Sequence, residues 1–310
     1  MKITYSIVAP IYNELENLPE LHRRVSEVMN SSGEPWELIL VDDGSTDGST
    51  DKMRELAKAD KRVRPVIFAR NFGHQVAITA GWDYARGDAV VIIDADLQDP
   101  PEVILDLARK WKEGFEVVYA VRAEREGETW FKKLTASVFY RLIRWITDVN
   151  IPVDTGDFRL MDRKVVNVLK QMKERHRFPR GMSAWVGFKQ IGVEYKRAAR
   201  VAGVTKYPFR KMLKLALNAI TGFSYFPLQV ATYFGFVSAA IAILAIPVVI
   251  YLRVTGSQAF FGQATTLIAV LFLGGVQLIS LGILGEYIGR LYDEAKGRPL
   301  YIVRDEPEGE

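Results

Sequence analysis

Two long stretches without a charged side chain constrain the folding of this sequence more than any other feature. No Asp, Glu, Lys or Arg occurs from Leu215 to Leu252 or from Val254 to Gly285. Each stretch exceeds the roughly 20 apolar residues that a helix needs to cross a bilayer. We therefore predict two membrane-spanning helices, near 229–252 and 264–288, in a hairpin over 229–290. Two long helices buried in a protein core are the alternative, which the lack of charge disfavours.

Basic residues lie at both ends of this predicted hairpin, on the side of the large N-terminal part. They are Lys206, Arg210, Lys211 and Lys214 before the first span, and Arg290, Lys296 and Arg298 after the second. The connection between the spans carries Arg253 alone. By the positive-inside rule, the N-terminal part and the tail at 291–310 are expected in the cytoplasm. The N-terminus is too short and too strand-like for a signal peptide, which agrees with this orientation.

Up to residue 209 the charges are interspersed, and two periodicities alternate along the chain. Short, nearly continuous apolar runs rich in β-branched residues occur at 3–12, 36–44, 63–70, 89–96 and 115–122. Helical stretches accompany them at 17–32, 49–60, 72–86 and 100–114. Strands that alternate with helices predict a doubly wound, mainly parallel α/β sheet over residues 1–209. Ligands of such sheets bind at the carboxyl ends of the strands, so polar residues that follow a strand matter most.

The fourth apolar run ends in a cluster of acids, "DADLQD". Asp94 and Asp96, with the amide oxygen of Gln98, are hard-oxygen ligands that suit Mg²⁺ or Mn²⁺. The alternative is an acidic loop, in which Asp99 caps a helix before two prolines and Glu102 is a first-turn acid. We expect Asp99 and Glu102 to have those structural roles. The metal site is favoured for Asp94 and Asp96 because the strand before them is buried.

Other polar residues at strand ends are less specific. Asp42 and Asp43 suit hydrogen bonds to a base or ribose, although a turn before a helix also uses such residues. Tyr12 is placed to stack on a base. His74 is interpreted as a surface or packing histidine. The chain has no G-x-G-x-x-G after its first strand and no P-loop motif, so neither dinucleotide binding nor P-loop phosphate binding is indicated.

Later segments have the character of a membrane-facing surface. Residues 130–147 carry aromatic and aliphatic side chains with Lys and Arg interleaved at helical spacing, which fits an ordinary amphipathic helix or an interfacial one. Residues 210–228 have the same pattern directly before a predicted span, and we interpret them as an interfacial juxtamembrane helix. Arg200 and Lys206 lie in a basic run where an anionic lipid head group would arrive; a solvated basic run is the alternative.

Composition excludes some classes of function. The chain has 310 residues and no Cys, so disulfides and thiolate chemistry are excluded. Its net charge of +4 is modest and gives no indication of nucleic-acid binding. Gly285 and Gly289 form one small-x-x-x-small step in the second predicted span, which is compatible with helix packing in a homo-oligomer.

Six motifs in a fixed order carry a resemblance to a known family. They are "APIYNE", "VDDGSTDGS", "ARNFGHQVA", "DADLQDPPE", "GDFRLMD" and "AGVTKYPF". The chain resembles the family-2 glycosyltransferases of the GT-A fold, in particular the polyprenyl-phosphate glycosyltransferases of the dolichol-phosphate mannose synthase and bactoprenol glucosyltransferase type. The similarity covers essentially the whole chain. "AGVTKY" lacks the acidic residue of the more usual G-E-S-K-Y, so a role for that acid is not carried over.

The resemblance implies a metal-dependent, inverting hexosyltransferase that moves a hexose, expected to be glucose, from a UDP-sugar to a polyprenyl phosphate at the cytoplasmic face of a bacterial plasma membrane. The residues implied to hold the nucleotide are Pro10, Tyr12, Glu14, Asp42, Asp43, Arg70 and Asp94. Asp94, Asp96 and Gln98 would bind Mg²⁺ or Mn²⁺. Asp96 and Asp157 would be the catalytic residues, and Asp157 is the residue usually proposed as base. Arg200 and Lys206 would hold the acceptor phosphate.

The chemistry of the acceptor changes what Asp157 is expected to do. A phosphate monoester has its second pKa near ~6, so the nucleophile is mostly deprotonated at neutral pH and needs no strong base. We therefore predict that Asp157 orients a metal-site or phosphate-binding group such as Arg159. A structural ion pair of these two residues is the alternative.

Two other functions are compatible with parts of the pattern. A processive polysaccharide synthase shares the first domain, but the nearest match to its Q-x-x-R-W motif is "RLIRW" at 141–145, which lacks the Gln. A non-catalytic nucleotide-sugar-binding membrane subunit is the other, and the complete set of acids argues against it.

Overall fold

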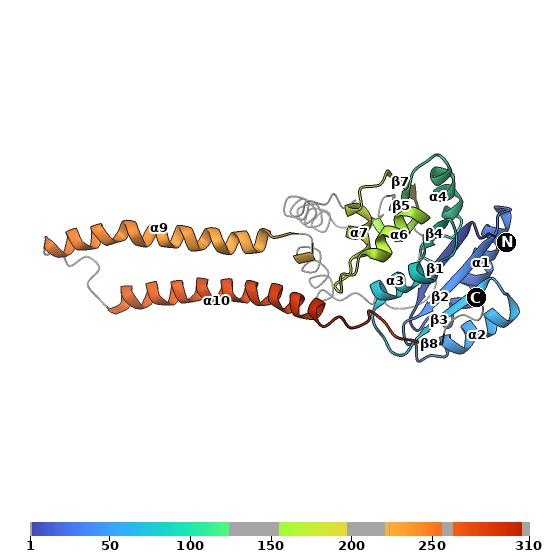
Figure 1. Cartoon of the computed structure of the whole chain (residues 1–310), viewed down its shortest axis with the longest axis horizontal. Coiled ribbons are helices and arrows are strands. Elements are labelled where there is room, and N and C mark those ends of the chain that lie inside the picture. The colour runs from blue at the N-terminus through green and yellow to red at the C-terminus, as the bar shows by residue number, and fades with distance from the viewer. Residues whose placement is uncertain (1, 124–154, 197–220, 223, 256–262, 306–310) are drawn as a thin grey trace.

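The computed structural model describes residues 2–123, 155–196, 221–222, 224–255 and 263–305. Two long helices run side by side away from a domain in which helices surround a sheet (Figure 1). The predicted interfacial helix at 130–147 lies outside the described residues, as does most of the segment 210–228.

One sheet of eight strands organises the described part of the domain. The strands are β1 Tyr5–Ile11, β2 Trp36–Asp42, β3 Val63–Phe68, β4 Ala89–Ile92, β5 Val117–Arg122, β6 Thr155–Asp162, β7 Gln190–Tyr195 and β8 Val303–Asp305. Their order across the sheet is β7-β5-β6-β4-β1-β2-β3-β8. β1 to β4 are parallel, whereas β6 is antiparallel to both β4 and β5, and β8 is antiparallel to β3. The five strands predicted from the sequence are confirmed.

Helices cover both faces of the sheet, as a doubly wound fold requires. Among the described residues of the domain, the helices are α1 Leu18–Ser31, α2 Ser49–Ala59, α3 His74–Tyr84, α4 Val103–Lys112, α6 Arg163–Gln171 and α7 Pro179–Trp185. Side chains alternate along each strand, so Ile7 and Ile11 of β1 pack with α1, α2 and α4, while Val8 packs with α3 on the other face. The four predicted helices and the α/β class are confirmed.

The prediction that Asp99 caps α4 is wrong. The residue before the helix is Glu102, and it makes no capping hydrogen bond with its side chain. Asp99 is instead completely buried and accepts a hydrogen bond from the hydroxyl of Tyr195. Glu102 forms an ion pair with Arg24 of α1. The two prolines after Asp99 begin a turn, which moves the start of the helix to Val103.

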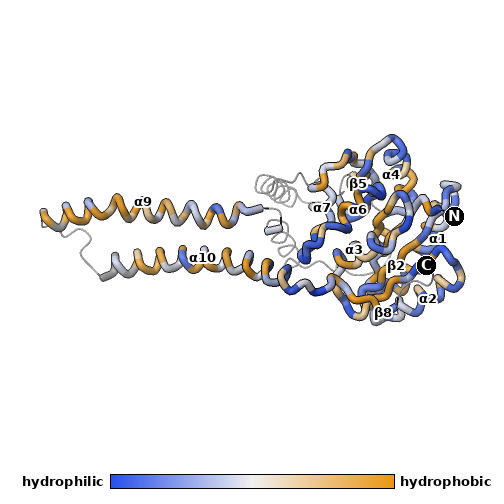
Figure 2. The backbone as a smooth tube through the Cα atoms, viewed as in Figure 1, coloured by the Kyte–Doolittle hydropathy of each residue, from blue (hydrophilic) through white to orange (hydrophobic). Residues whose placement is uncertain are grey.

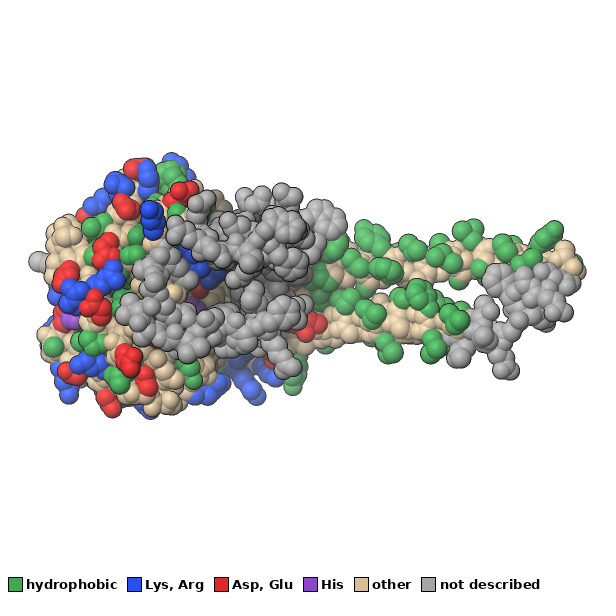
Figure 3. All heavy atoms as spheres, turned by 180° about the vertical axis from the view of Figure 1, so that it is seen from behind, with side chains coloured by type: hydrophobic (Ala, Val, Ile, Leu, Met, Phe, Trp, Pro, Cys, Tyr) green, Lys and Arg blue, Asp and Glu red, His purple; other side chains and the backbone are tan. Residues whose placement is uncertain are grey.

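Two helices have the length and composition to cross a membrane. α9 spans Phe226–Val254 and α10 spans Gln263–Ala295. Their apolar segments, Phe226–Leu252 and Ile268–Ala295, have no buried residues. Hydrophobic residues predominate along both helices (Figure 2), and their side chains project outward on the face seen in Figure 3. The alternative of two buried core helices is therefore wrong, because nothing in the described chain covers them.

The segment after α10 returns to the domain and becomes part of it. Val303–Asp305 form β8 on the free edge of β3, and Ala69 donates its N–H to the carbonyl of Ile302 (2.9 Å). Tyr301 stacks on Phe68 with ring centroids 5.1 Å apart and donates its hydroxyl to Asp83 of α3 (2.8 Å). This strand covers an edge that would otherwise expose unpaired backbone groups.

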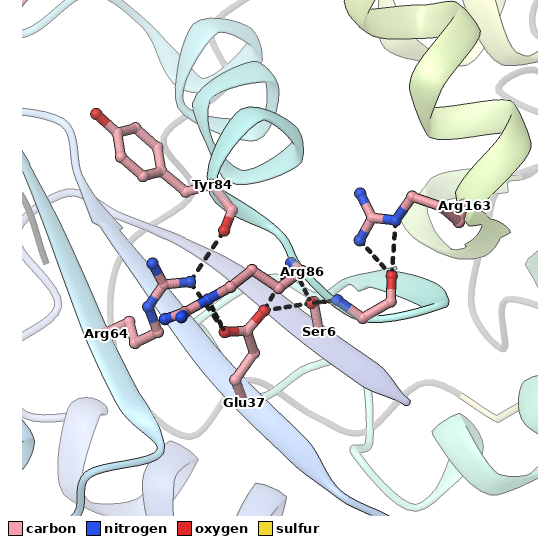
Figure 4. A network of polar contacts seen from close by, with 7 residues as sticks. Ser6, Glu37, Arg64, Tyr84, Arg86 and Arg163 are labelled. Carbon is pink, nitrogen blue, oxygen red and sulfur yellow. Dashed lines mark hydrogen bonds and ion pairs between the residues drawn. The ribbon is translucent and has the colours of Figure 1, made fainter. Parts of the chain in front are cut away.

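A polar network ties the amino ends of the strands together (Figure 4). Glu37 of β2 is buried and accepts hydrogen bonds from Ser6 (2.5 Å), from Arg64 (2.9 Å) and from the N–H of Arg86 (2.8 Å). Ser6 and Glu37 are neighbours in the β1–β2 ladder, near the start of each strand. The network therefore lies at the end of the sheet opposite the polar strand ends, and its role is structural.

Candidate functional site

The loops that follow β1 and β2 are locked together by side chains. The N–H of Asn13 donates to the hydroxyl of Ser45 (3.0 Å), and the N–H of Thr46 donates to the side-chain oxygen of Asn13 (2.8 Å). The N–H of Glu14 donates to the hydroxyl of Ser49 (3.0 Å). Asn13 has a φ of +56°, a conformation that Asn tolerates better than most residues. One rigid edge therefore carries the polar residues of both strand ends.

The loop after β3 joins this edge because residue 44 is glycine. A Cβ at Gly44 would lie 2.6 Å from the backbone nitrogen of Asn71 and 2.7 Å from the carbonyl carbon of Arg70. Its φ of +74° is also a conformation that disfavours other residues. The backbones of the "DDG" and "ARN" segments can thus approach within contact distance.

Asp42 and Asp43, predicted to contact a base or ribose, hold these loops with their carboxylates. Asp42 accepts the N–H of Ser45 (2.8 Å) and the hydroxyl of Thr50. Asp43 accepts the N–H groups of Phe72 (2.6 Å) and Gly73 (3.0 Å) from the loop after β3. Burial raises the pKa of Asp43, although these N–H groups oppose the shift. Both acids therefore hold the loops of this edge in place, and direct contact with a nucleotide stays a prediction.

The other residues predicted to hold the nucleotide line the same edge. Pro10 is buried in β1 opposite Val41, and Tyr12, at the end of that strand, is 44% exposed. Glu14 accepts a hydrogen bond from Asn17 (2.6 Å). Arg70 is exposed after β3, with its guanidinium 4.0 Å from the ring centroid of Phe72. Tyr12 and Arg70 are thus the two of this set that present accessible side chains.

The acids after β4 lie in a turn rather than on an extended strand. β4 ends at Ile92, and Leu97 has a φ of +56°. Asp96 accepts the N–H of Gln98 (3.2 Å). Within the part of the chain that the structure describes, the buried oxygens Asp94 Oδ1 and Gln98 Oε1 receive no hydrogen bond. Burial, together with the neighbouring acids, raises the pKa of Asp94 to about 6, although His74 opposes the shift.

This donor set fits a divalent cation shared with a substrate. Among the described residues, no group of three His, Cys, Asp or Glu side chains is arranged to hold a metal ion by itself. A Mg²⁺ or Mn²⁺ site in a nucleotide-binding protein needs fewer protein ligands, because phosphate oxygens and water complete its shell. Two carboxylates and an amide oxygen at the edge of the sheet are suitable ligands, and two of these oxygens lack a hydrogen-bond donor in the described chain.

The antiparallel register of β6 brings Asp157 beside these acids. Ile92 of β4 is opposite Arg159 of β6 in an antiparallel pair. Asp94, two residues after Ile92, therefore lies near Asp157, two residues before Arg159. His74, the first residue of α3, lies between them, with Nε2 3.3 Å from Asp157 Oδ2 and 3.7 Å from Asp94 Oδ1. His74 is exposed, in keeping with its interpretation as a surface histidine, but it also contacts both acids, which that interpretation did not include. Its place in the site follows from the pairing of β4 with β6, which has no local signal in the sequence.

Asp157 is paired with Arg180 and not with Arg159. Arg180 Nε donates to Asp157 Oδ1 (2.8 Å) and its Nη2 donates to Oδ2 (3.2 Å), a bidentate contact. Arg159 donates to the hydroxyl of Ser183 and to the carbonyl of Gly156 (2.9 Å). The prediction that Asp157 orients Arg159 directly is thus wrong, because the arginine that Asp157 contacts is Arg180. α7, which carries Arg180 and Ser183, fixes both residues of β6.

The charges of this cluster determine the ionisation of its members. Burial alone would raise the pKa of Asp157, but Arg180 and His74 outweigh burial and hold that pKa well below its usual range. Burial alone would lower the pKa of His74, but Asp157 and Asp94 outweigh it and raise that pKa to about 9. Burial lowers the pKa of Arg159 to about 10, so it remains a cation at neutral pH. Asp157 is accordingly an anion held between two cations.

A second polar group adjoins the acids from the other side. Tyr195 of β7 donates its hydroxyl to Asp99, and Arg122 Nε of β5 lies 3.5 Å from the same hydroxyl oxygen. Tyr195 and Asp99 raise the pKa of Arg122 even though burial opposes the shift. Arg122 was not among the predicted residues, because it ends a strand without any motif. The predicted acceptor residues Arg200 and Lys206 lie outside the described residues.

Comparison with known proteins identifies the family. Residues 6–169 match the profile described as Glycosyl transferase family 2, and residues 226–291 match the GtrB C-terminal hairpin. The chain belongs to glycosyl transferase family 2. The resemblance stated from the motifs is confirmed, and so are the GT-A fold and the two-helix hairpin.

Relatives match along nearly the whole glycosyltransferase chain. It is 54% identical over 302 residues to an uncharacterized glycosyltransferase of Bacillus subtilis, with 97% of this chain and 94% of the relative covered. It is 44% identical over 306 residues to a bactoprenol glucosyl transferase of Shigella phage SfV, with 99% of each covered. A mannosyltransferase from Pyrobaculum calidifontis in complex with GDP-Man and Mn²⁺ is similar at a TM-score of 0.45 and 18% identity, with 93% of this chain and 88% of that chain covered.

Proposed function

We propose that this glycosyltransferase moves a hexose, glucose in the first instance, from a UDP-sugar to a polyprenyl phosphate at the membrane surface. The observation that carries the proposal is the 44% identity over full length to a bactoprenol glucosyl transferase, helices of the hairpin included. The arrangement of charges at the carboxyl ends of β1, β2, β3, β4 and the start of β6 supplies a chemical reason for each substrate.

The donor would bind across the edge formed by the loops after β1, β2 and β3. Tyr12 would stack on the base, and Arg70 would pair with a phosphate, since both side chains are accessible there. Asp42 and Asp43 would act through the loops that they hold. Rigid loops lower the entropy cost of binding a flexible nucleotide.

The diphosphate would lie against the acids after β4. Asp94, Asp96 and Gln98 would hold Mg²⁺ or Mn²⁺ there. Such an ion, when bound, supplies neutralisation of the charge that develops on the departing UDP. The raised pKa of Asp94, about 6, reflects the cost of its buried charge, which a cation would relieve.

The acceptor phosphate would attack the sugar from the side of β6 and α7. A single displacement of this kind inverts the anomeric carbon. Asp157 is already an anion held by Arg180 and His74, so it is a poor proton acceptor, and the phosphate oxygen needs none near neutral pH. Asp157 would instead hold Arg180, and with it Arg159 through α7, in position beside the phosphate.

The hairpin would keep the site at head-group depth. A polyprenyl chain stays in the bilayer, so the domain must meet its phosphate at the interface. α9 and α10 would cross the membrane, and the basic residues that flank them would place the domain and the tail in the cytoplasm. Arg200 and Lys206 would add positive charge on the path of the phosphate.

A transfer assay tests the proposal. Full-length protein in lipid is incubated with a radiolabelled UDP-hexose and polyprenyl phosphate, and label is counted in the organic phase. We expect label with Mn²⁺, a loss on chelation, and a loss of at least about a hundredfold for Asp96→Asn. A panel of UDP- and GDP-sugars identifies the donor. Nucleotide binding without transfer to lipid phosphate from any sugar would favour a non-catalytic subunit and overturn the proposal.

A further inference from the structure

The last turn of α10 and the tail behind it contact a loop of the catalytic domain. Glu294 Oε1 accepts the N–H of Arg175 (2.6 Å), and Asp293 Oδ2 lies 3.3 Å from Nε2 of His176. The side chain of Arg175 donates to the carbonyl of Arg298 (2.7 Å). Two contacts thus join Arg175 and His176 of the loop to the end of α10, and a third joins Arg175 to the tail behind it.

This loop leads directly into the helix that holds Asp157. It follows α6 and runs over residues 172–178 into α7, which begins at Pro179 and carries Arg180. α7 has seven residues, so it is too short to be a stable helix on its own. Its position therefore depends on tertiary contacts. Met182, in the middle of α7, is buried in the core beside α3 and α6, and both ends of the helix are held as well. At its far end Gln190 donates to the carbonyl of Ser183 (2.8 Å), and at its near end the loop is held by α10.

The element that carries the other partner of Asp157 is also held by the segment after α10. α3 begins with His74 and ends near Asp83, which accepts the hydroxyl of Tyr301 (2.8 Å). Asp157 is 4% exposed. The charge of its carboxylate is compensated by two cations from two different helices, Arg180 of α7 and His74 of α3. Displacement of either cation would leave a buried charge without its partner, which is costly.

We propose that Glu294 is a positioning residue of the transfer reaction, which acts through the 172–178 loop and Arg180 on Asp157. The proposal rests on the proposed function. The contact of Glu294 with the loop couples α10 to the acceptor side of the site. Arg180 and Asp157 would then have the geometry that transfer requires when the loop is bound to the end of α10. A hydrogen bond from a backbone N–H to a carboxylate is charge-assisted and stronger than a neutral one. An ion pair between two mobile surface side chains, in contrast, contributes little.

The competing interpretation is that these are surface contacts without influence on the site. Matched variants of one helix separate the two. Glu294→Ala removes the acceptor of the Arg175 N–H, whereas Glu294→Gln keeps an acceptor oxygen at that position. Glu286→Ala is the control, because Glu286 lies two turns earlier on α10, is exposed, and its ion pair is with Arg290 of the same helix.

The experiment uses full-length protein in lipid nanodiscs with two readouts. Hydrogen exchange by mass spectrometry follows the amides of residues 172–185, and steady-state kinetics with a UDP-hexose and polyprenyl phosphate separate kcat from the KM of each substrate. For Glu294→Ala we expect faster exchange in 172–185 and a kcat lowered about fivefold, with the KM of the donor unchanged. Glu294→Gln is expected to restore most of both.

The proposal would be overturned if the Glu294→Ala variant had the same hydrogen exchange and the same kcat as the Glu286→Ala variant. It would also be overturned if kcat fell equally in Glu294→Gln and Glu294→Ala. A wild-type protein that transfers no sugar to the lipid would instead contradict the proposed function. In that case the exchange data alone decide whether Glu294 holds the loop and α7.

Discussion

Arg180 and Asp157 form a bidentate ion pair between α7 and β6, with Nε–Oδ1 and Nη2–Oδ2 distances of 2.8 and 3.2 Å. His74 approaches the same carboxylate to 3.3 Å. A carboxylate with both oxygens engaged by cations has its pKa depressed, in spite of its burial. The stability that this pair contributes is present above the unfolded value of about 3.9 and is lost as the pH falls through the folded pKa.

Asp157→Asn should lower transfer without changing the shape of its pH dependence. Asp157 is ionised throughout the working range, so the acid limb of kcat/KM is expected to follow the second ionisation of the lipid phosphate, near ~6. We expect a loss of about ten- to a hundredfold at every pH, because Arg180 loses its partner. The measurement is kcat/KM from pH 5 to 9. If Asp157 were the base, the variant would regain activity steeply at high pH.

Gly44→Ala should weaken nucleotide binding. The added Cβ would meet the backbone of Arg70 and Asn71 at 2.6–2.7 Å, and backbone atoms cannot move aside as a side chain can. We expect the dissociation constant of UDP, measured by calorimetry, to rise at least about tenfold. Gly33→Ala is the control, since Gly33 also has a positive φ, +68°, but has open space around it. Equal effects of the two substitutions would show that backbone strain alone, and not the approach of the loops, is responsible.

Glu37→Ala should destabilise the domain while sparing the site. It would leave Arg64 and the N–H of Arg86 without their buried acceptor (Figure 4). Glu37 lies near the start of β2, at the opposite end of the sheet from the acids. We expect a loss of about 3–5 kcal/mol in the free energy of unfolding, by chemical denaturation. Glu27→Ala, which removes an exposed i,i+4 pair with Arg23, should cost less than about 0.5 kcal/mol. A folded Glu37→Ala protein that no longer binds UDP would contradict the assignment of this network as structural.

Tyr301→Ala should loosen the tail from the domain more than Tyr301→Phe does. The alanine loses both the stack on Phe68 and the hydrogen bond to Asp83, whereas the phenylalanine loses the hydrogen bond alone. We expect costs of about 3 kcal/mol and 1 kcal/mol. Thermal unfolding and limited proteolysis after residue 297 provide the measurement. Equal costs for the two variants would mean that the ring contributes nothing and that β8 is held by its backbone alone.

The parts of the fold that the sequence predicted are those with strong local patterns. β1 to β5 are nearly continuous apolar runs, and α1, α2 and α4 are amphipathic, so their type followed from periodicity. The hairpin followed from the absence of charge over residues 215–252 and 254–285. β8 could not be predicted, because three residues in a charged tail carry no periodicity and pair with β3 through the return of α10.

The sequence predicted the acidic residues of the candidate site but not its cationic residues. Asp94, Asp96 and Asp157 lie in recognisable motifs directly after or within apolar runs. His74 and Arg180 join them only because β6 inserts antiparallel between β4 and β5, and because α7 packs over β6. Such pairings depend on tertiary contacts that no spacing along the chain records. Asp99 was misjudged for the same reason, since its partner Tyr195 comes from β7, far along the chain.

The metal site at Asp94 and Asp96 is tested most directly by a crystal structure of the protein with UDP and Mn²⁺, with anomalous scattering recorded at the manganese edge. We predict one strong anomalous peak within about 2–2.6 Å of carboxylate oxygens of Asp94 or Asp96 and of UDP phosphate oxygens, on the side that faces Asp157. UDP bound elsewhere on the chain, or a manganese ion remote from these acids, would contradict it.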